Sequence, residues 1–164
     1  MEIVMARIDN RLLHGITASQ WAPRSQAQRL MVIDDETAGN EMMKASMKLA
    51  RPAGMALSII ALDTAITNIK NGKYGNETIY IITKKLQTYQ RLIQETGVKI
   101  KAINIGATAQ VSAEAMKERT VLSKFASFDS EEMRIAQSLC EQGVHLYVQY
   151  LAADTPHDFS EYLK

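Results

Sequence analysis

Short apolar runs recur along the chain and alternate with amphipathic stretches, and this alternation limits the possible folds more than any other feature. Most of the runs are nearly continuous in aliphatic and β-branched residues, without a strict apolar-polar alternation. Strands covered by helices on both faces have this composition, as in a parallel sheet. The runs that we interpret as strands are 3–5, 30–33, 57–60, 79–82, 103–105 and 146–150.

The stretches between these runs carry helix signals. Apolar residues recur every three or four positions in 62–69 and 86–93, and a glycine that can end a helix follows each stretch. Asp129 and Glu132 form a capping-box pattern at the start of another helix. The methionine-rich segment 42–47 predicts a helix whose methionines fill the core. This order implies right-handed crossovers and an α/β fold, with a single doubly wound, mostly parallel sheet flanked by helices on both faces.

Length and composition agree with an ordinary globular protein. The 164 residues, with 46% hydrophobic and 23% charged residues, fit one domain over 1–164. The formal net charge is +1 and the basic residues are dispersed, which argues against a nucleic-acid partner. Cys140 is the only cysteine, no signal peptide is visible, and no apolar run approaches the ~20 residues of a membrane span, so we expect a cytoplasmic protein. The least regular stretch is 107–122, where we expect a short extra strand near Val121.

The predicted fold restricts where a site can lie. In such sheets ligands bind outside the carboxyl ends of the strands, where the loops into the helices meet. The candidate positions are the loop after the first strand, Asp34 and Asp35 after the second, Thr83 and Lys84 after the fourth, and Gly106 after the fifth.

The loop after the first strand is the richest in chemistry. Arg7, Asp9, Arg11 and His14 lie within eight residues, and a helix is expected to begin near Gly15. An arginine fork and a helix N-terminus both bind phosphate oxygens, and a neutral imidazole is a nucleophile toward phosphorus. The alternative is a solvated loop with local ion pairs.

Other chemistries lack a signal in the sequence. The three histidines and one cysteine do not have the spacing of metal ligands, so we expect no metal site. A glycine-rich nucleotide-binding motif is also missing from the sequence, and we expect no cofactor.

The segment 7–15, Arg-Ile-Asp-Asn-Arg-Leu-Leu-His-Gly, resembles an active-site signature of one bacterial family, Arg-Ile-Asp-x-Arg-Leu-x-His-Gly-Gln-Val. The family is the IIB component of mannose/fructose/sorbose-type sugar phosphotransferase systems. The resemblance continues in Trp21 and in the segments 32–36, 103–106 and 143–149, and therefore covers the whole chain.

This resemblance implies a phosphoryl relay. A phosphohistidine of the IIA partner would pass its phosphoryl group to His14, and His14 would pass it to a sugar that enters through the membrane components IIC and IID. The family suggests Nδ1 as the acceptor atom. The protein would then be a sugar phosphotransferase that needs no cofactor and associates peripherally with the membrane permease.

The resemblance also suggests roles for the surrounding residues. Arg7, Arg11 and the amides around Gly15 would hold the phosphoryl oxygens. Supporting roles fall to three further residues: Asp9 would orient an arginine or stiffen the loop, Asp35 would brace the loop from the next strand end, and Thr83 would supply a hydroxyl.

Two departures from the family leave alternatives open. Ile16-Thr17 replaces the expected Gln-Val, and 107–108 is Ala-Thr where a second glycine is common. A regulatory or phosphosugar-binding module without turnover is therefore one alternative. The paired acids after the second strand raise another alternative, a receiver-like domain phosphorylated on Asp34 or Asp35, although it leaves Arg7, Arg11 and His14 unexplained. The sugar stays open among mannose, fructose, sorbose and N-acetylgalactosamine.

Overall fold

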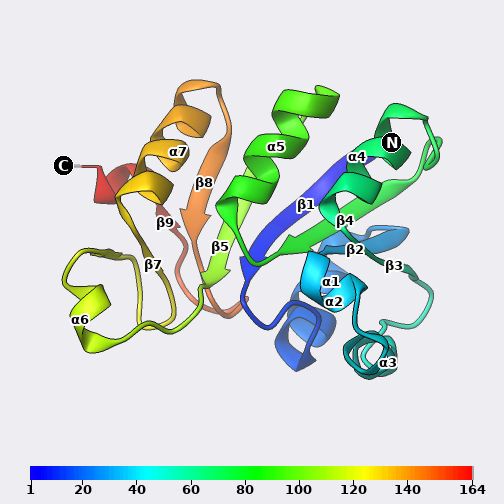
Figure 1. Cartoon of the computed structure of the whole chain (residues 1–164), viewed down its shortest axis with the longest axis horizontal. Coiled ribbons are helices and arrows are strands. Elements are labelled where there is room, and N and C mark those ends of the chain that lie inside the picture. Colours follow the sequence, from blue (N-terminus) through cyan, green and yellow to red (C-terminus); the bar gives the residue numbers. More distant parts are fainter. Residues whose placement is uncertain (164) are drawn as a thin grey trace.

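A computed structural model describes residues 1–163, and its centre is a seven-stranded sheet in the order β3-β2-β4-β1-β5-β8-β9 (Figure 1). All neighbouring strands are parallel except β8 and β9, which pair antiparallel. Every expected strand is present, and the expected mostly parallel α/β fold is confirmed. The strands of this sheet are β1 (Glu2–Asp9), β2 (Arg29–Ile33), β3 (Ala56–Ile60), β4 (Thr78–Thr83), β5 (Ala102–Ala107), β8 (His145–Val148) and β9 (His157–Asp158).

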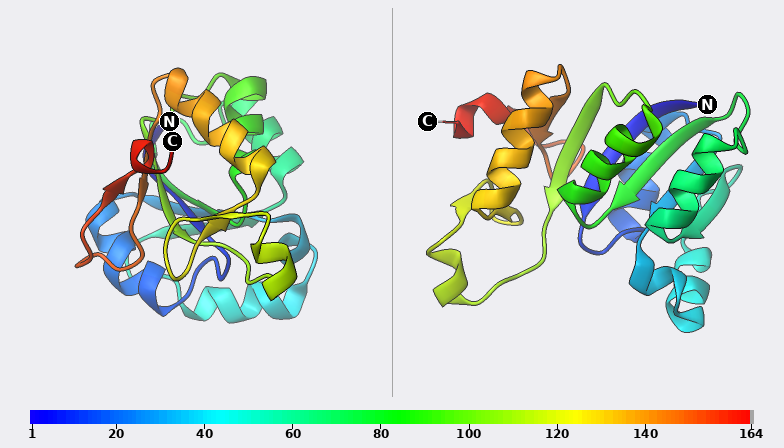
Figure 2. Two further views of the ribbon diagram at one scale, coloured as in Figure 1. Left: turned by 90° about the vertical axis from the view of Figure 1, so that its left-hand side faces the viewer. Right: turned by 45° about the horizontal axis from the view of Figure 1, so that its top comes forward.

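Helices cover both faces of the sheet, as Figure 2 shows in its left-hand view. One face carries α4 (Leu62–Lys70), α5 (Leu86–Thr96) and α7 (Ser130–Glu141). The other carries the π-helix η1 (Thr17–Trp21), α1 (Ala22–Ser25), α2 (Asp35–Ala38) and α3 (Glu41–Leu49). The 3₁₀ helix η2 (Phe159–Tyr162) follows β9.

The buried residues form two cores, one on each side of the sheet. The core under α4, α5 and α7 contains Leu92, Ile135 and Leu139 together with strand residues such as Ile81. The opposite core holds Trp21, Leu30 and Tyr80, and also Leu12 and Leu13 of the loop that follows β1. Two buried leucines therefore anchor this loop to the second core.

The predicted helix ends are confirmed in detail. Gly97 ends α5 with a φ of 70°, in the left-handed region that glycine adopts without strain. Asp129 accepts a hydrogen bond from the Glu132 N–H, and the Glu132 side chain accepts one from the Asp129 N–H. This is the capping box that the sequence predicts.

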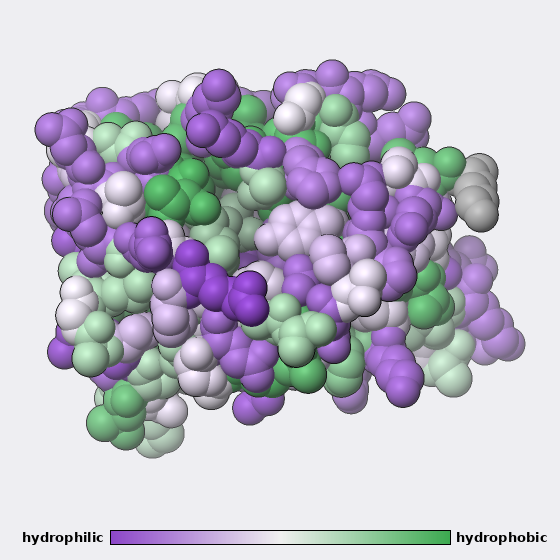
Figure 3. Space-filling view, turned by 180° about the vertical axis from the view of Figure 1, so that it is seen from behind, coloured by the Kyte–Doolittle hydropathy of each residue, from purple (hydrophilic) through white to green (hydrophobic). Residues whose placement is uncertain are grey.

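The interpretation of the methionine-rich helix was wrong in one respect. Segment 42–47 is helical, as part of α3, but none of the α3 residues is buried. Met42 is 83% exposed and Leu49 is 91% exposed. Figure 3 shows apolar side chains at its lower left corner, over α3. The helix α3 lies at the end of the sheet, so only one of its faces can pack against the core, and its other apolar residues stay in solvent.

The irregular segment between β5 and α7 is an excursion at the other end of the sheet. It contains the short helix α6 (Ala113–Met116) and the antiparallel pair β6 (Thr120–Val121) and β7 (Ser127–Phe128). The extra strand expected near Val121 is β6. Figure 1 shows this excursion and α3 at opposite ends of the molecule.

Candidate functional site

The sheet topology places the loop after β1 in a crevice. Strand β1 lies between β4 and β5. After β1 the chain continues into η1 on one face of the sheet, whereas after β4 and β5 it continues to α5 and α7 on the other face. The loops after β1 and β5 therefore diverge at the carboxyl edge of the sheet. Such a switch point is the usual ligand site of an open α/β sheet.

The backbone of the loop is held in a defined turn. Leu12 is fully buried and has a φ of 58°, in the left-handed region that non-glycine residues rarely adopt. Its N–H donates to the carbonyl of Asp9 over 3.0 Å. The cost of this conformation, about 1–2 kcal/mol, is offset by burial of the leucine side chain. The turn brings His14 back beside the end of β1.

Asp9 is the centre of the site. Its Oδ2 accepts hydrogen bonds from Nε and Nη2 of Arg7 and contacts Nε2 of His14, each at 3.1 Å. Its Oδ1 accepts the backbone N–H of Arg11 at 3.0 Å. Burial raises the pKa of Asp9, but the hydrogen bond from His14 and the charge of Arg7 outweigh burial, so the pKa lies below its ordinary value. Asp9 is therefore an anion at neutral pH and can only accept hydrogen bonds.

The contact with Asp9 determines which imidazole nitrogen of His14 is open. Because the carboxylate can only accept, Nε2 of His14 carries the proton that it donates, and in the neutral ring the lone pair is therefore on Nδ1. The backbone of His14 is fixed as well. Its N–H donates to Oγ1 of Thr17 at 2.9 Å, and the Thr17 hydroxyl donates to the Leu12 carbonyl at 2.9 Å. Thr17, one of the departures from the family signature, thus holds the histidine in place.

Arg7 is fully buried under this site. Besides Asp9, its guanidinium donates to the side chain of Asn104, to the Gln149 carbonyl at 3.2 Å and to the Tyr150 carbonyl at 3.1 Å. These contacts use all five N–H donors of an arginine. The direct phosphate contact expected of Arg7 therefore does not fit the structure, and Arg7 instead holds Asp9.

The space for the Arg7 guanidinium depends on Gly106. A Cβ atom at position 106 would lie 2.2 Å from Cζ of Arg7, which is closer than any real contact. On another side Cζ of Arg7 lies 4.9 Å from the centre of the Trp21 ring, and Nε1 of Trp21 donates to the Tyr150 carbonyl at 3.0 Å. The sequence alone did not indicate these roles of Tyr150 and Asn104, because the residues lie far from Arg7 along the chain. Trp21, Asn104 and Gly106 nevertheless lie in segments that carry the family resemblance.

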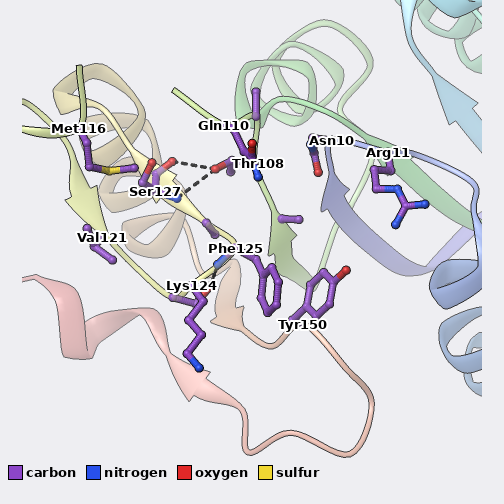
Figure 4. A pocket seen from close by; sticks show the side chains of 14 residues that line it. Asn10, Arg11, Thr108, Gln110, Met116, Val121, Lys124, Phe125, Ser127 and Tyr150 are labelled. Carbon is purple, nitrogen blue, oxygen red and sulfur yellow. Dashed lines mark hydrogen bonds between the residues drawn. The ribbon is translucent and has the colours of Figure 1, made fainter. Parts of the chain in front are cut away.

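Arg11 has the opposite environment from Arg7. Its side chain is exposed and forms no hydrogen bond or ion pair with the rest of residues 1–163. It stands at the rim of a cleft of about 260 Å³ between the loop after β1 and the excursion that contains α6, β6 and β7. Figure 4 shows Asn10 and Arg11 on one side of the cleft, and Phe125 and Tyr150 face to face in its middle.

Gly15 is the first helical residue after His14, as expected. The helical stretch continues over 15–25, and the His14 carbonyl accepts the Ala18 N–H at 2.8 Å. The first amides of a helix have no partner within it. A Cβ atom at Gly15 would meet no atom within 4 Å, so there is open space beside these amides.

Two further predicted site residues have other roles. Oδ1 of Asp35 accepts the Leu62 N–H at the start of α4 over 2.9 Å. It therefore does not brace the loop of His14, because β4 separates β2 from β1 in the sheet. The Thr83 hydroxyl donates to the Lys85 carbonyl at 3.1 Å within its own turn, so its proton is not offered to the site.

The other two histidines lie outside the site. His145 contacts Asp158 at 2.9 Å and His157 contacts Glu161 at 3.0 Å, all four on the surface. Within residues 1–163, no three His, Cys, Asp or Glu side chains are grouped so that they could hold a metal ion. In the same part of the chain, no helix is both long enough and apolar enough to cross a membrane.

Comparison with known proteins shows the family of the chain. The family model described as the PTS system sorbose subfamily IIB component matches residues 3–164. The chain belongs to this family. The resemblance found in the sequence is thus confirmed, and the protein is a IIB component of a sugar phosphotransferase system, a phosphocarrier domain of sugar uptake.

Relatives of this IIB chain are named for several sugars. It is 28% identical to the sorbose-specific EIIB component of Klebsiella pneumoniae over 94% of this chain and 90% of that protein. The fructose-specific EIIB component of Bacillus subtilis is 27% identical over 100% of this chain and 97% of the relative. The crystal structure of the IIBSor domain of the sorbose permease from Klebsiella pneumoniae has a TM-score of 0.88 and 26% identity, covering 99% of this chain and 96% of that one.

Proposed function

We propose that this IIB chain carries a phosphoryl group on Nδ1 of His14. The observation that carries the proposal is the contact between Asp9 and Nε2 of His14, which in the neutral ring places the lone pair on the other ring nitrogen. An oriented neutral imidazole is the form of histidine that attacks phosphorus. The hydrogen bond to Asp9 would also stabilise the positive charge that the ring gains when Nδ1 forms a bond to phosphorus.

The reaction consists of two displacements at phosphorus. In the first, the Nδ1 lone pair of His14 forms a bond to the phosphorus of a phosphohistidine on the IIA partner, and the donor's N–P bond breaks with its electron pair returning to the donor ring. In the second, a sugar hydroxyl attacks, the bond from Nδ1 to phosphorus breaks, and the hydroxyl proton leaves to solvent. Both steps need alignment and charge stabilisation more than further covalent chemistry.

The surrounding residues divide this work. The exposed guanidinium of Arg11 and the open amides at Gly15 would hold the phosphoryl oxygens. Arg7 is a positioning residue, because it reaches His14 only through Asp9. The sugar would arrive through membrane components IIC and IID, with this chain bound peripherally on the cytoplasmic side. A fused EIIAB relative, the mannose-specific component of Escherichia coli, supports a IIA partner, and this chain covers 46% of that relative.

Label transfer from phosphorylated IIA tests this function. We expect the purified chain to acquire one phosphoryl group that acid removes and base does not, as is typical of phosphohistidine. The His14→Gln variant should acquire none, and His157→Gln, a change on the exposed surface, should be loaded like the wild type. Label retained by His14→Gln would contradict the proposal. An unlabelled wild type would favour a regulatory or phosphosugar-binding module.

A further inference from the structure

The cleft beside Arg11 combines three features that a site for a small sugar does not need. Three of the large apolar side chains that are exposed in residues 1–163 line it, namely Met116, Val121 and Phe125. Val121 is 59% exposed and Phe125 is 47% exposed. Apolar side chains gathered in this way on a surface mark a contact with another macromolecule more often than single exposed residues do.

The charges around the cleft all have the same sign. Arg11 and Lys124 are its only charged lining residues, and neither is paired with an acidic side chain of residues 1–163. The rest of the lining is polar or apolar and includes Asn10, Gln110 and Thr108. A rim with two free cations and no carboxylate favours a partner that brings negative charge.

The walls of the cleft are held by internal contacts, and the cleft adjoins the loop after β1. Phe125 and Tyr150 stack with their ring centres 3.9 Å apart (Figure 4). The Thr108 N–H donates to the Phe125 carbonyl at 3.0 Å, and the Thr108 hydroxyl donates to the Ser127 carbonyl at 3.2 Å. Arg11, on the opposite rim, lies three residues from His14. A protein that brings its phosphorylated residue to His14 therefore meets this preformed surface.

We propose that this cleft is the docking surface for the phosphorylated donor protein. The inference rests on the proposed function of His14 and specifies where its donor binds. The donor surface that fits has an apolar side chain that enters beside Val121 and Phe125, with acidic groups or the phosphoryl group itself facing Arg11 and Lys124. The donor brings a phosphoryl group with it, whereas a neutral sugar brings no negative charge, so the two free cations favour the donor.

Steady-state loading kinetics with two phosphodonors test the docking surface. Val121→Glu and Lys124→Glu should each raise the KM for phosphorylated IIA by about tenfold and leave kcat unchanged. Loading of the same variants from phosphoramidate, a small donor that needs no docking surface, should equal that of the wild type. This second donor also shows that the variants are folded.

Two control variants match these changes outside the cleft. Leu49→Glu places the same charge on an exposed apolar residue of α3, at the other end of the sheet. Lys101→Glu reverses an exposed charge just before β5, at the opposite edge of the sheet from the cleft. Both should be loaded from phosphorylated IIA with the wild-type KM.

The other outcomes would overturn the docking proposal. One such outcome is that the variants keep the wild-type KM for phosphorylated IIA and still acquire label on His14. This result would refute the docking surface and leave the proposed function intact. An equal loss of loading with both donors would mean that Val121 and Lys124 maintain the structure of the site and do not bind the donor protein. Normal loading combined with slower delivery to sugar in permease-containing vesicles would assign the cleft to the permease. A wild type that accepts no label from either donor would refute the proposed function itself.

Discussion

Arg7 and Arg11 lie four residues apart and have opposite environments. Arg7 has all five N–H donors in use inside the protein, whereas the side chain of Arg11 stands in solvent beside the cleft. Residue type predicts that an arginine in this loop binds an anion, but it does not tell a phosphate from a buried carboxylate. The distinction depends on Gln149 and Tyr150, whose contribution is a backbone carbonyl that any residue has.

Replacement of Asp9 should affect both folding and transfer. Asp9→Asn leaves the buried Arg7 cation without its anion, so we expect the free energy of unfolding to fall by about 3–5 kcal/mol. Urea denaturation measures this loss. Asp34→Asn changes a partly exposed carboxylate that contacts Lys84 at 3.5 Å, and it should cost less than half as much. An equal loss in the two variants would contradict the central role of Asp9.

Asp9 should also contribute to acid sensitivity. Its pKa is lower in the folded protein than in the unfolded chain, where an aspartate has a pKa of about 3.9. Its stabilising contribution is therefore complete above about pH 4 and is lost as the pH falls through the lower folded value. The difference in unfolding free energy between wild type and Asp9→Asn should shrink in that range. Urea titrations from pH 7 down to about pH 2 would reveal a constant difference if this is incorrect.

Two glycines of the site should respond differently to alanine. In Gly106→Ala the new methyl group collides with Arg7, which cannot move without losing buried hydrogen bonds, so we expect a loss of about 2–4 kcal/mol and slower phosphoryl transfer. Gly15→Ala meets open space and should keep its unfolding free energy within about 0.5 kcal/mol. Thermal and urea denaturation of both variants checks the contrast. Similar losses would show that the two glycines have the same structural role.

At the scale of the elements, α7 begins with a capping box formed by Asp129 and Glu132. Asp129 accepts the Glu132 N–H at 2.7 Å, so Asp129→Ala should lower the free energy of unfolding by about 1 kcal/mol. Glu131→Ala removes a first-turn carboxylate that caps nothing and should change it by less than about 0.5 kcal/mol. Chemical denaturation compares the two. A larger loss for Glu131→Ala would mean that the capping box contributes little.

Strands and helices could be predicted from the sequence because their signals are local. Apolar runs mark β1 to β5 and β8, and glycines or capping residues mark the helix ends. The order of strands is not local, and this explains why the expected role of Asp35 failed. It follows β2, which is next to β1 in sequence but separated from it by β4 in the sheet. The excursion at 109–128 was hard to predict because its strands are only two residues long.

At the scale of the whole molecule, burial and not residue type determines how much an apolar side chain contributes. Leu92 of α5 is fully buried in one core, so Leu92→Ala should cost about 2–5 kcal/mol of unfolding free energy. Leu49→Ala in α3 should cost less than about 0.5 kcal/mol, since the side chain is in solvent. The midpoints of urea denaturation would separate these cases. A large loss of unfolding free energy for Leu49→Ala would contradict the exposed position of this side chain.

The contacts of Arg7 also link the site to the order in which the chain is synthesised. The carbonyls of Gln149 and Tyr150 lie 142 and 143 residues after Arg7, so they are synthesised long after it. Until then the guanidinium lacks two of its acceptors, and burying it at the end of β1 is unfavourable. The arrangement of Arg7, Asp9 and His14 is consequently complete only once the chain has been synthesised past Tyr150. Shorter chains would contain His14 without the support of a fully hydrogen-bonded Arg7.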